Sequence, residues 1–279
     1  MAPSAGKFLS EIIAARLRSV EETRARVPLG RVQQDAEKRT ERRDFTGALS
    51  ARGVNIIAEL KKASPSKGVL REDYQPEAIA RSYEQAGAAA LSVLTEESYF
   101  QGSLDHLHQA RAATELPVLR KDFILDAYQV YEAIAAGADA LLLIVAALDP
   151  KKLNYLTRLC RNLKIEPLVE VHSEDELETA LEAEAKLIGV NNRHLKTFEV
   201  SLATSLRLID RIPRDCVAVS ESGISSGLEA ARMKEAGFSA VLVGEQFMRA
   251  PDPGRELEAM LAGAHEESFR PRGRAATEK

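Results

Sequence analysis

From about residue 54 onward, short runs of leucine and β-branched residues alternate with segments whose apolar residues recur at helical spacing. The runs are predicted strands, at residues 54–61, 89–95, 117–123, 138–145, 166–171, 186–192, 216–222 and 239–245. They are nearly continuous apolar runs, which is typical of strands buried on both faces of a parallel sheet. Their starts lie roughly 20 to 35 residues apart, the length of one strand–helix unit.

The segments between these runs carry helix signals. Ile79, Tyr83 and Ala86 fall near one helical face, and a second apolar stripe contains Ala127, Val130, Tyr131 and Ile134. Capping signals mark three helix starts, at Asp149-Pro150, at Ser173 with Glu176, and at Ser226 with Glu229. Where a helix gives way to a strand, QAGAAALSV, AAGADALLL and EAGFSAVLV resemble one another, and each glycine suits a left-handed helix cap.

These units predict an α/β protein, a single (β/α)8 TIM barrel over residues 54–266. Eight strand–helix units within about 200 residues fit a closed barrel better than an open, doubly wound sheet. The first strand is followed by no glycine-rich dinucleotide motif, which also disfavours the open sheet. The open sheet is the alternative fold.

Residues 1–53 precede the barrel and are helical in pattern. Leu9, Ile12, Ile13 and Leu17 form an apolar stripe, so we expect an N-terminal helical extension packed on the barrel. It would cover the lower end or the rim of the barrel, and a regulatory or partner-binding helix is the alternative. The polar tail, residues 267–279, is expected to be disordered.

Composition narrows the class of protein. The 279 residues are 45% hydrophobic and 29% charged, as in a globular protein with a substantial core. A net charge of -4 gives no reason to expect nucleic acid or an anionic membrane as a partner, so an anionic ligand would need a local cluster of donors. Oligomeric state stays open between a monomer and a weak homodimer.

The cysteines and the apolar runs bear on cellular location. Cys160 and Cys216 have no CxxC spacing and no neighbouring histidine, so neither a disulfide framework nor a metal site is expected. The longest apolar run, residues 140–148, is too short to span a bilayer. Glu11, Glu21 and Glu22 interrupt the N-terminal apolar residues, which disfavours a signal peptide. We expect a cytoplasmic protein.

Charged residues gather where the predicted strands end. Barrel enzymes carry their reacting groups at these carboxyl ends. Glu59 and Lys61 lie two residues apart and therefore point to the same side of the sheet. Other strands end in further polar residues, Lys121, Glu170, Asn191 with Arg193, and Glu221. Any one of these could be a solvated strand end, but a ring of lysines and glutamates in a water-poor mouth is costly unless the groups pair or react. The ring predicts an active site.

A second set of residues suggests phosphate binding. Ser222 and Gly223 follow the seventh strand, and Gly244 follows the eighth. The loops after strands seven and eight often form a phosphate site in this fold. The loop KKASPSKG after the first strand adds Ser64. We therefore expect a phosphorylated small molecule as the substrate.

The motifs IIAELKKASPSKG, VLRKDFI, PLVEVH, IGVNNR, SESGI and VGEQFMR, in this order, resemble the indole-3-glycerol phosphate synthase family over about residues 8–265. The resemblance implies closure of the indole ring of 1-(2-carboxyphenylamino)-1-deoxyribulose 5-phosphate with release of carbon dioxide and water. It implies no metal and no organic cofactor. Some family members carry a fused second barrel, for which this chain has no room, so we expect a monofunctional enzyme.

The resemblance also implies a role for each matching residue. Lys121 would be a general acid at the ketone, Glu170 a general base or the stabiliser of a cationic intermediate, and Lys61 the binder of the substrate carboxylate that also takes part in proton transfer. Glu59 would orient Lys61, Glu221 would complete the acid–base set, and Asn191 and Arg193 would lie near polar groups of the substrate. The aromatic ring would contact Phe100, Phe123, Leu142 and Leu195, and the phosphate would contact Ser64, Ser222, Gly223, Gly244 and Glu245. Some members have a small residue at the position of Glu245, so only its backbone N–H is expected to bind phosphate.

Two questions remain open at the level of the sequence. Lys61 and Lys121 could lower each other's pKa, whereas Glu59 and Glu170 would raise them. The rival functions are another phosphate-binding barrel enzyme, such as a Schiff-base aldolase that uses Lys61 or Lys121 as nucleophile, and a non-catalytic binding barrel.

Overall fold

The eight predicted strands form a closed barrel in the computed structural model, which describes residues 7–195 and 197–268. Strand β1 (Asn55–Leu60) pairs in parallel with β10 (Ala240–Val243) on one side and with β4 (Ala90–Leu94) on the other, which closes the ring. Between them lie β5 (Val118–Lys121), β6 (Ala140–Ile144), β7 (Glu166–Val171), β8 (Leu187–Asn191) and β9 (Val217–Glu221). The (β/α)8 barrel is confirmed, and the open sheet is excluded.

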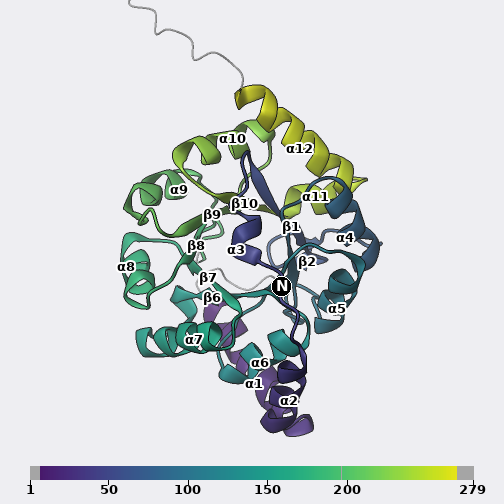
Figure 1. The fold of residues 1–279 in the computed structure, drawn as a ribbon, viewed down its shortest axis with the longest axis vertical. Coiled ribbons are helices and arrows are strands. Elements are labelled where there is room, and N and C mark those ends of the chain that lie inside the picture. The colour runs from purple at the N-terminus through teal and green to yellow at the C-terminus, as the bar shows by residue number, and fades with distance from the viewer. Residues whose placement is uncertain (1–6, 196, 269–279) are drawn as a thin grey trace, which may run out of the picture.

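Helices surround this ring, as the view down the barrel shows (Figure 1). The outer helices are α4 (Pro76–Gln85), α5 (Leu104–Ala113), α6 (Ala127–Ala135), α7 (Pro150–Asn162), α8 (Glu174–Glu182), α9 (Ala203–Leu208), α10 (Gly227–Ala236) and α12 (Pro253–Ser268). The short helices η1 (Val145–Ala147), η2 (Ile209–Arg211) and α11 (Glu245–Arg249) lie in the connections. The loop after β1 contains an unpredicted hairpin of β2 (Ala63–Ser64) and β3 (Gly68–Val69), too short to leave a periodic signal.

The predicted helix caps are present. Side-chain oxygens of Asp149, Ser173 and Ser226 each accept a hydrogen bond from a backbone N–H three residues later. In a capping box the glutamate would accept a hydrogen bond from the backbone N–H of the cap residue itself. Here Glu176 and Glu229 accept instead from the backbone N–H one residue earlier, that of His172 and Ser225. Left-handed glycines end α4, α6 and α10, as predicted, at Gly87, Gly137 and Gly237.

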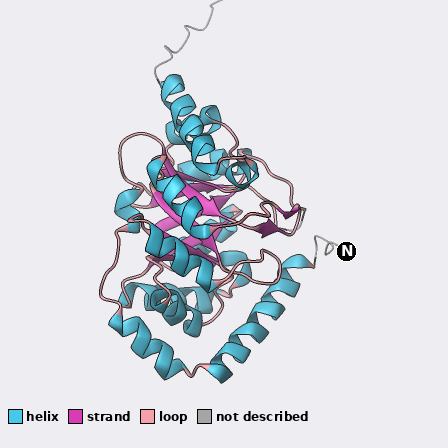
Figure 2. Ribbon diagram, turned by 90° about the vertical axis from the view of Figure 1, so that its right-hand side faces the viewer, coloured by secondary structure: helices cyan, strands magenta, loops and turns pink. Residues whose placement is uncertain are grey.

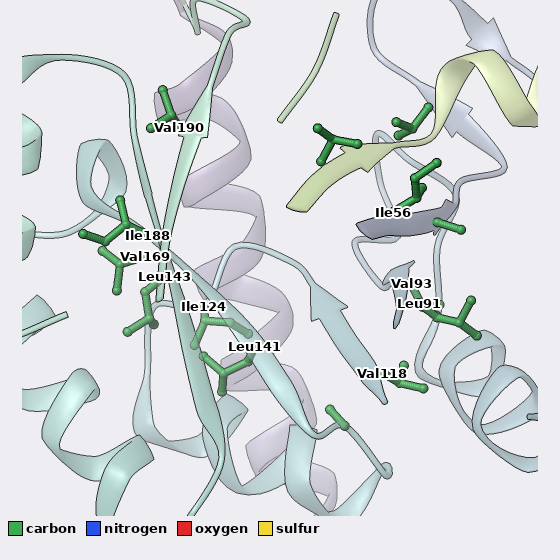
Figure 3. Close-up of a cluster of buried hydrophobic side chains, with 14 of the residues drawn as sticks. Ile56, Leu91, Val93, Val118, Ile124, Leu141, Leu143, Val169, Ile188 and Val190 are labelled. Atoms are coloured by element: carbon green, nitrogen blue, oxygen red, sulfur yellow. The ribbon is translucent and has the colours of Figure 1, made fainter. Parts of the chain in front are cut away.

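Alternating side chains of the strands build two apolar layers. One layer fills the barrel and contains Ile57, Ala90, Leu119, Ala140, Leu142, Leu168, Leu187, Val219, Ala240 and Leu242. The other lies between the barrel and its helices, and Figure 3 shows part of it, including Ile56, Leu91, Val93, Val118, Leu141, Leu143, Val169, Ile188 and Val190. Because both faces are apolar, the strands read as unbroken hydrophobic runs.

The N-terminal extension consists of α1 (Phe8–Arg26), α2 (Leu29–Lys38) and α3 (Phe45–Ala48). Helices α1 and α2 pack against α6 and project from the ring of helices (Figures 1 and 2). Phe45 of α3 and the following Leu49 are fully buried in the inner layer, so α3 closes the barrel interior. The predicted tail begins two residues too early, because α12 extends to Ser268, and residues 269–279 lie outside the described residues.

The predicted stripe on α1 was partly wrong. The buried face carries Phe8, Ile12, Arg16 and Val20, whereas Leu17 is 46% exposed. The guanidinium of Arg16 donates a hydrogen bond of 2.6 Å to the carboxylate of Asp122, which follows β5. A buried ion pair thus occupies a position where periodicity would place an apolar residue, because only the folded chain brings Asp122 to α1.

Phe45 supplies a test of this closure. Phe45→Ala should lower the free energy of unfolding by about 3–5 kcal/mol, because truncation of a buried phenylalanine leaves a cavity. Leu17→Ala, at an exposed position of α1, is the control and should change it by less than about 0.5 kcal/mol. Urea denaturation followed by circular dichroism measures both. Equal stability of Phe45→Ala and the wild type would contradict the role of α3.

Candidate active site

A cavity of about 740 Å³ opens at the carboxyl ends of the barrel strands. Every residue predicted for the site lines it, from Glu59 and Lys61 on β1 and just beyond it to Gly244 and Glu245 after β10. The remaining predicted residues in the lining are Ser64, Phe100, Lys121, Phe123, Leu142, Glu170, Asn191, Arg193, Leu195, Glu221, Ser222 and Gly223. The fold therefore brings the whole predicted set into one cavity.

Glu59 and Lys61 form an ion pair of 2.6 Å at the end of β1. Glu59 is almost fully buried, and Lys61 is half-buried. Burial by itself would raise the pKa of Glu59, but the charges of Lys61, Lys121 and Arg193 outweigh it and hold that pKa below its ordinary value. Glu59 is therefore an ionised partner that fixes the ammonium group of Lys61.

Lys121 lies between two carboxylates. Its Nζ is 3.4 Å from an oxygen of Glu170 and 3.3 Å from an oxygen of Glu221. Burial would lower the pKa of Lys121, but the charges of Glu221, Glu170 and Glu59 outweigh burial and raise it. The sequence left open whether neighbouring lysines or glutamates dominate the pKa of Lys121, and the glutamates do. Lys121 is a cation in the free protein.

The two carboxylates beside Lys121 differ from each other. Burial raises the pKa of Glu221 to about 7. The charge of Lys121 lowers this pKa, but the negative charges of Glu170 and Glu59 act in the opposite direction. Burial also acts on Glu170, but Lys121, His172 and a hydrogen bond from Asn191 lower its pKa. At neutral pH the site therefore holds an ionised Glu170 and a Glu221 that titrates, a pair of unlike carboxyl groups suited to proton transfer.

Two glycines give these glutamates the room they need. A Cβ atom at Gly244 would collide with the side chain of Glu59, and one at Gly189 would collide with that of Glu221. Gly244 thus has a steric role inside the barrel, besides the approach to an anion predicted from the sequence. Gly189 was not predicted, because it lies inside an apolar run without a turn signal.

Arg193 connects the charged ring with the loops after β8 and β10. Its backbone N–H donates to the side-chain oxygen of Asn191 at 3.0 Å, and its guanidinium lies 3.5 Å from the carboxylate of Glu245. A guanidinium nitrogen of Arg249 lies 3.6 Å from the other oxygen of Glu245. The Glu245 side chain is thus bound between two arginines.

Apolar side chains line the cavity beside the charged ring. Phe123 and Leu142 belong to the inner layer, and Phe100 and Leu195 pack against it. Phe8 of α1 also lines the cavity, and its ring lies 5.3 Å from that of Tyr99 and 5.4 Å from that of Phe198 between centroids. The sequence analysis missed Phe8, because nothing in the sequence places the start of α1 at the carboxyl ends of the barrel strands.

The loops predicted to bind phosphate have unusual features. Ser222 and Gly223 both adopt positive φ, 65° and 81°, so the chain turns sharply after β9. Such a conformation costs a serine about 1 kcal/mol or more and is typical of functional sites. The hydroxyl of Ser64 is buried at the cavity and has no hydrogen-bond partner among the described residues. A bound ligand would satisfy it.

Glu96 is a buried carboxylate at the cavity that the sequence reasoning missed. It accepts hydrogen bonds from the backbone N–H groups of Ser98, Tyr99 and Phe100, so it fixes the loop that carries Phe100. Burial raises its pKa despite these bonds. Its place just beyond β4 follows the pattern that identified Glu59 and Glu221, and this signal could have found it.

In the described part of the chain, no helix is both long and apolar enough to cross a membrane. The same residues include no group of three or more His, Cys, Asp or Glu side chains placed to hold a metal ion.

The pKa of Glu221 can be tested through stability. In the folded chain it is about 7, above the ordinary 4.5, so the stability that protonation provides is present below pH 4.5 and is lost as the pH rises through 7. Glu221→Gln lacks this titration. Its free energy of unfolding relative to the wild type should therefore rise from pH 5 to 8 by at most on the order of 3 kcal/mol, at about 1.4 kcal/mol per pKa unit.

Chemical denaturation at a series of pH values measures this difference. Glu258→Gln, at an exposed position of α12, reports the effect of losing a carboxylate outside the site. A pH-independent difference for Glu221→Gln would mean that Glu221 is ionised throughout this range.

The chain is similar to solved structures in fold. It matches thiamine phosphate pyrophosphorylase from Pyrococcus furiosus with a TM-score of 0.60 at 16% identity, covering 81% of this chain and 100% of that one. It matches 3-hexulose-6-phosphate synthase from Salmonella typhimurium with a TM-score of 0.60 at 14% identity, covering 75% and 99%. At such low identity the likeness confirms the barrel and carries no statement about activity.

Sequence comparison is more specific. Residues 9–260 match the family model for indole-3-glycerol phosphate synthase. The chain is 54% identical to the indole-3-glycerol phosphate synthase of Polaromonas sp. (strain JS666) over 258 residues, which cover 91% of this chain and 98% of that protein. It is 52% identical to the protein of the same name from Chromobacterium violaceum, again over 258 residues, covering 91% and 97%. The chain belongs to the indole-3-glycerol phosphate synthase family.

Proposed function

We propose that this chain catalyses the reaction for which its family is named. It closes the indole ring of 1-(2-carboxyphenylamino)-1-deoxyribulose 5-phosphate and releases carbon dioxide and water, giving indole-3-glycerol phosphate. The observation that carries the proposal is the position of Lys121 between Glu170 and Glu221, next to the Glu59–Lys61 pair and the apolar wall of one cavity.

Lys121 is the general acid of the ring closure. The ring carbon that bears the carboxylate attacks the ketone carbon, and the ketone oxygen takes a proton and becomes a hydroxyl group. An ammonium group is needed for this step, and the three carboxylates around Lys121 keep it protonated. Carbon dioxide then leaves with the loss of one C–C bond, and the bonding electrons return to the ring.

Elimination of water completes the indole. The new hydroxyl group leaves with a proton, and the neighbouring carbon gives up a proton to form the double bond. We assign the proton-accepting role to Glu170, whose ionised state in the buried site supports it. Glu221, with a pKa of about 7, exchanges protons with Lys121 and completes the acid–base set.

The remaining charged residues bind the substrate. Lys61 holds the carboxylate and takes part in proton transfer, and Glu59 orients it through their ion pair. Asn191 and Arg193 contact polar groups of the substrate. Phe100, Phe123, Leu142 and Leu195 hold the aromatic ring against the ketone, and positioning of this kind supplies several kcal/mol of the rate enhancement.

The phosphate is bound by Ser64, Ser222, Gly223 and Gly244, with Glu245 contributing only its backbone N–H. The unpartnered hydroxyl of Ser64 supports this assignment, since it is buried at the cavity and available to an anion. The carboxylate of Glu245 interacts with Arg193 and Arg249, so a direct contact with phosphate is disfavoured.

We also propose how the chain is organised, where in the cell it acts and in which oligomeric state. Residues 1–53 form the N-terminal extension, residues 54–268 the catalytic barrel and residues 269–279 a tail. The enzyme is cytoplasmic, which the free thiols of Cys160 and Cys216 support, and it acts as a monomer or weak homodimer.

Conversion of the substrate is the direct test. Purified protein mixed with 1-(2-carboxyphenylamino)-1-deoxyribulose 5-phosphate should give an indole product that is detected by fluorescence. The Schiff-base alternative predicts instead a lysine adduct that borohydride traps, and the raised pKa of Lys121 disfavours it because the nucleophile must be neutral. Absence of turnover by well-folded protein would refute the proposal, and tight substrate binding without turnover would identify a binding barrel.

Lys121→Ala tests the general acid. Its turnover number should fall by about 10²–10⁴-fold, because the ketone oxygen loses its proton donor, while substrate binding changes little. Lys151→Ala, at an exposed position of α7, is the matched control and should behave like the wild type. Steady-state kinetics and calorimetric substrate binding give both readouts. A turnover number near that of the wild type would exclude Lys121 from this role.

A further inference from the structure

His172 follows β7 two residues after Glu170, and its imidazole lies next to the carboxylate of that glutamate. The side chain is 10% exposed and is not among the described residues that line the cavity. His172 therefore does not contact substrate in the proposed mechanism, which leaves its buried ring without an assigned role.

The imidazole is held between two carboxylates. Nε2 lies 3.4 Å from Oε1 of Glu170, and Nδ1 lies 3.0 Å from Oε2 of Glu176 in the first turn of α8. The same oxygen of Glu176 accepts the backbone N–H of His172 at 2.7 Å. Glu176 thus fixes both the backbone and the ring of His172.

This geometry favours a doubly protonated ring. A carboxylate oxygen only accepts hydrogen bonds, so each ring nitrogen next to one is stable when it carries a proton. Nε2 has no hydrogen-bond partner among the described residues, and the carboxylate oxygen next to it is Oε1 of Glu170, at 3.4 Å. Burial would lower the pKa of His172, but its bond to Glu176 and the charges of Glu170, Glu176 and Glu221 raise it.

The two oxygens of Glu170 each lie next to a nitrogen-bearing side chain. Oε2 lies 3.4 Å from Nζ of Lys121, and Oε1 lies 3.4 Å from Nε2 of His172. Glu170 is 2% exposed, so without positive charges on these side chains burial would favour its protonated form. The charged groups that act on this arrangement come from β5, β7, α8 and β9, namely Lys121, Glu170, Glu176 and Glu221.

We propose that His172 is a positioning residue, an imidazolium anchored by Glu176 that holds Glu170 ionised and oriented beside Lys121. This proposal rests on the proposed function, in which Glu170 accepts a proton. Loss of His172 would remove one of the charges that lower the pKa of Glu170 and shift Glu170 toward its inactive, protonated form, whereas substrate contacts would persist.

The test compares the pH profiles of the wild type, His172→Asn and Glu176→Gln. On the acidic side of the profile, His172→Asn should lower the turnover number by about 10–100-fold, with the Michaelis constant within about two-fold. The acidic limb should move to higher pH by about one to two pH units, since one pKa unit is about a tenfold change in the ionised fraction, and the loss of turnover should disappear as the pH rises above the limb. Glu176→Gln should move the limb in the same direction by a smaller amount.

His108→Asn, at an exposed position of α5, is the matched control and should keep the wild-type profile. An equal loss of turnover at every pH, with an unmoved acidic limb, would identify a purely structural role and overturn the proposal. An unchanged profile for His172→Asn would overturn it as well.

Nitrogen-15 NMR of the His172 imidazole tests, without substrate, whether the ring between Glu170 and Glu176 is doubly protonated. In the wild type both ring nitrogens of His172 should be protonated at pH 7, and Glu176→Gln should lower the midpoint of this titration. A neutral ring at pH 7 would overturn the proposal. Failure of the wild type to turn over substrate would refute the proposed function, and the NMR signal would still decide whether the imidazolium exists.

Discussion

The ammonium group of Lys121 and the carboxylates of Glu170 and Glu221 share a site with little access to water. Each of these charges is costly to bury alone, and each is stabilised by the others. The carboxylates keep Lys121 protonated despite its burial, whereas burial, together with the charges of Glu170 and Glu59, shifts Glu221 toward neutrality. These opposite shifts provide a proton donor and groups that accept protons at the same pH, which is what a ring closure followed by dehydration requires.

The barrel makes this arrangement possible because alternate residues of each strand point inward. Apolar side chains fill the lower interior of the barrel. Two residues further along a strand the side chain points inward again, and there it is polar, as Glu59 follows Ile57 and Glu170 follows Leu168. Gly189 and Gly244 leave the space that Glu221 and Glu59 occupy. The same alternation of inward-pointing residues thus supplies the packed interior in the lower part of the barrel and the charged site at its upper end.

The N-terminal extension reaches both ends of this interior. Phe45 closes it within the inner layer, and Phe8 reaches the cavity through its contacts with Tyr99 and Phe198. Between these points Arg16 pairs with Asp122, the neighbour of Lys121 in the chain. Helix α1 is therefore connected to the strand end that carries the proposed general acid.

The strand–helix repeat, the barrel and the residues at the strand ends are predictable from the sequence, because they follow from local periodicity and from the rule that the carboxyl ends of parallel strands share one rim. Which charges meet depends instead on the closed barrel. The two nearest carboxylate partners of Lys121 are 49 and 100 positions away, and the raised pKa of Lys121 depends on their distances and burial. The roles of Phe8, Gly189 and the buried Arg16 could not be predicted for the same reason. Each depends on a residue that is distant in sequence and comes near only after the barrel has closed.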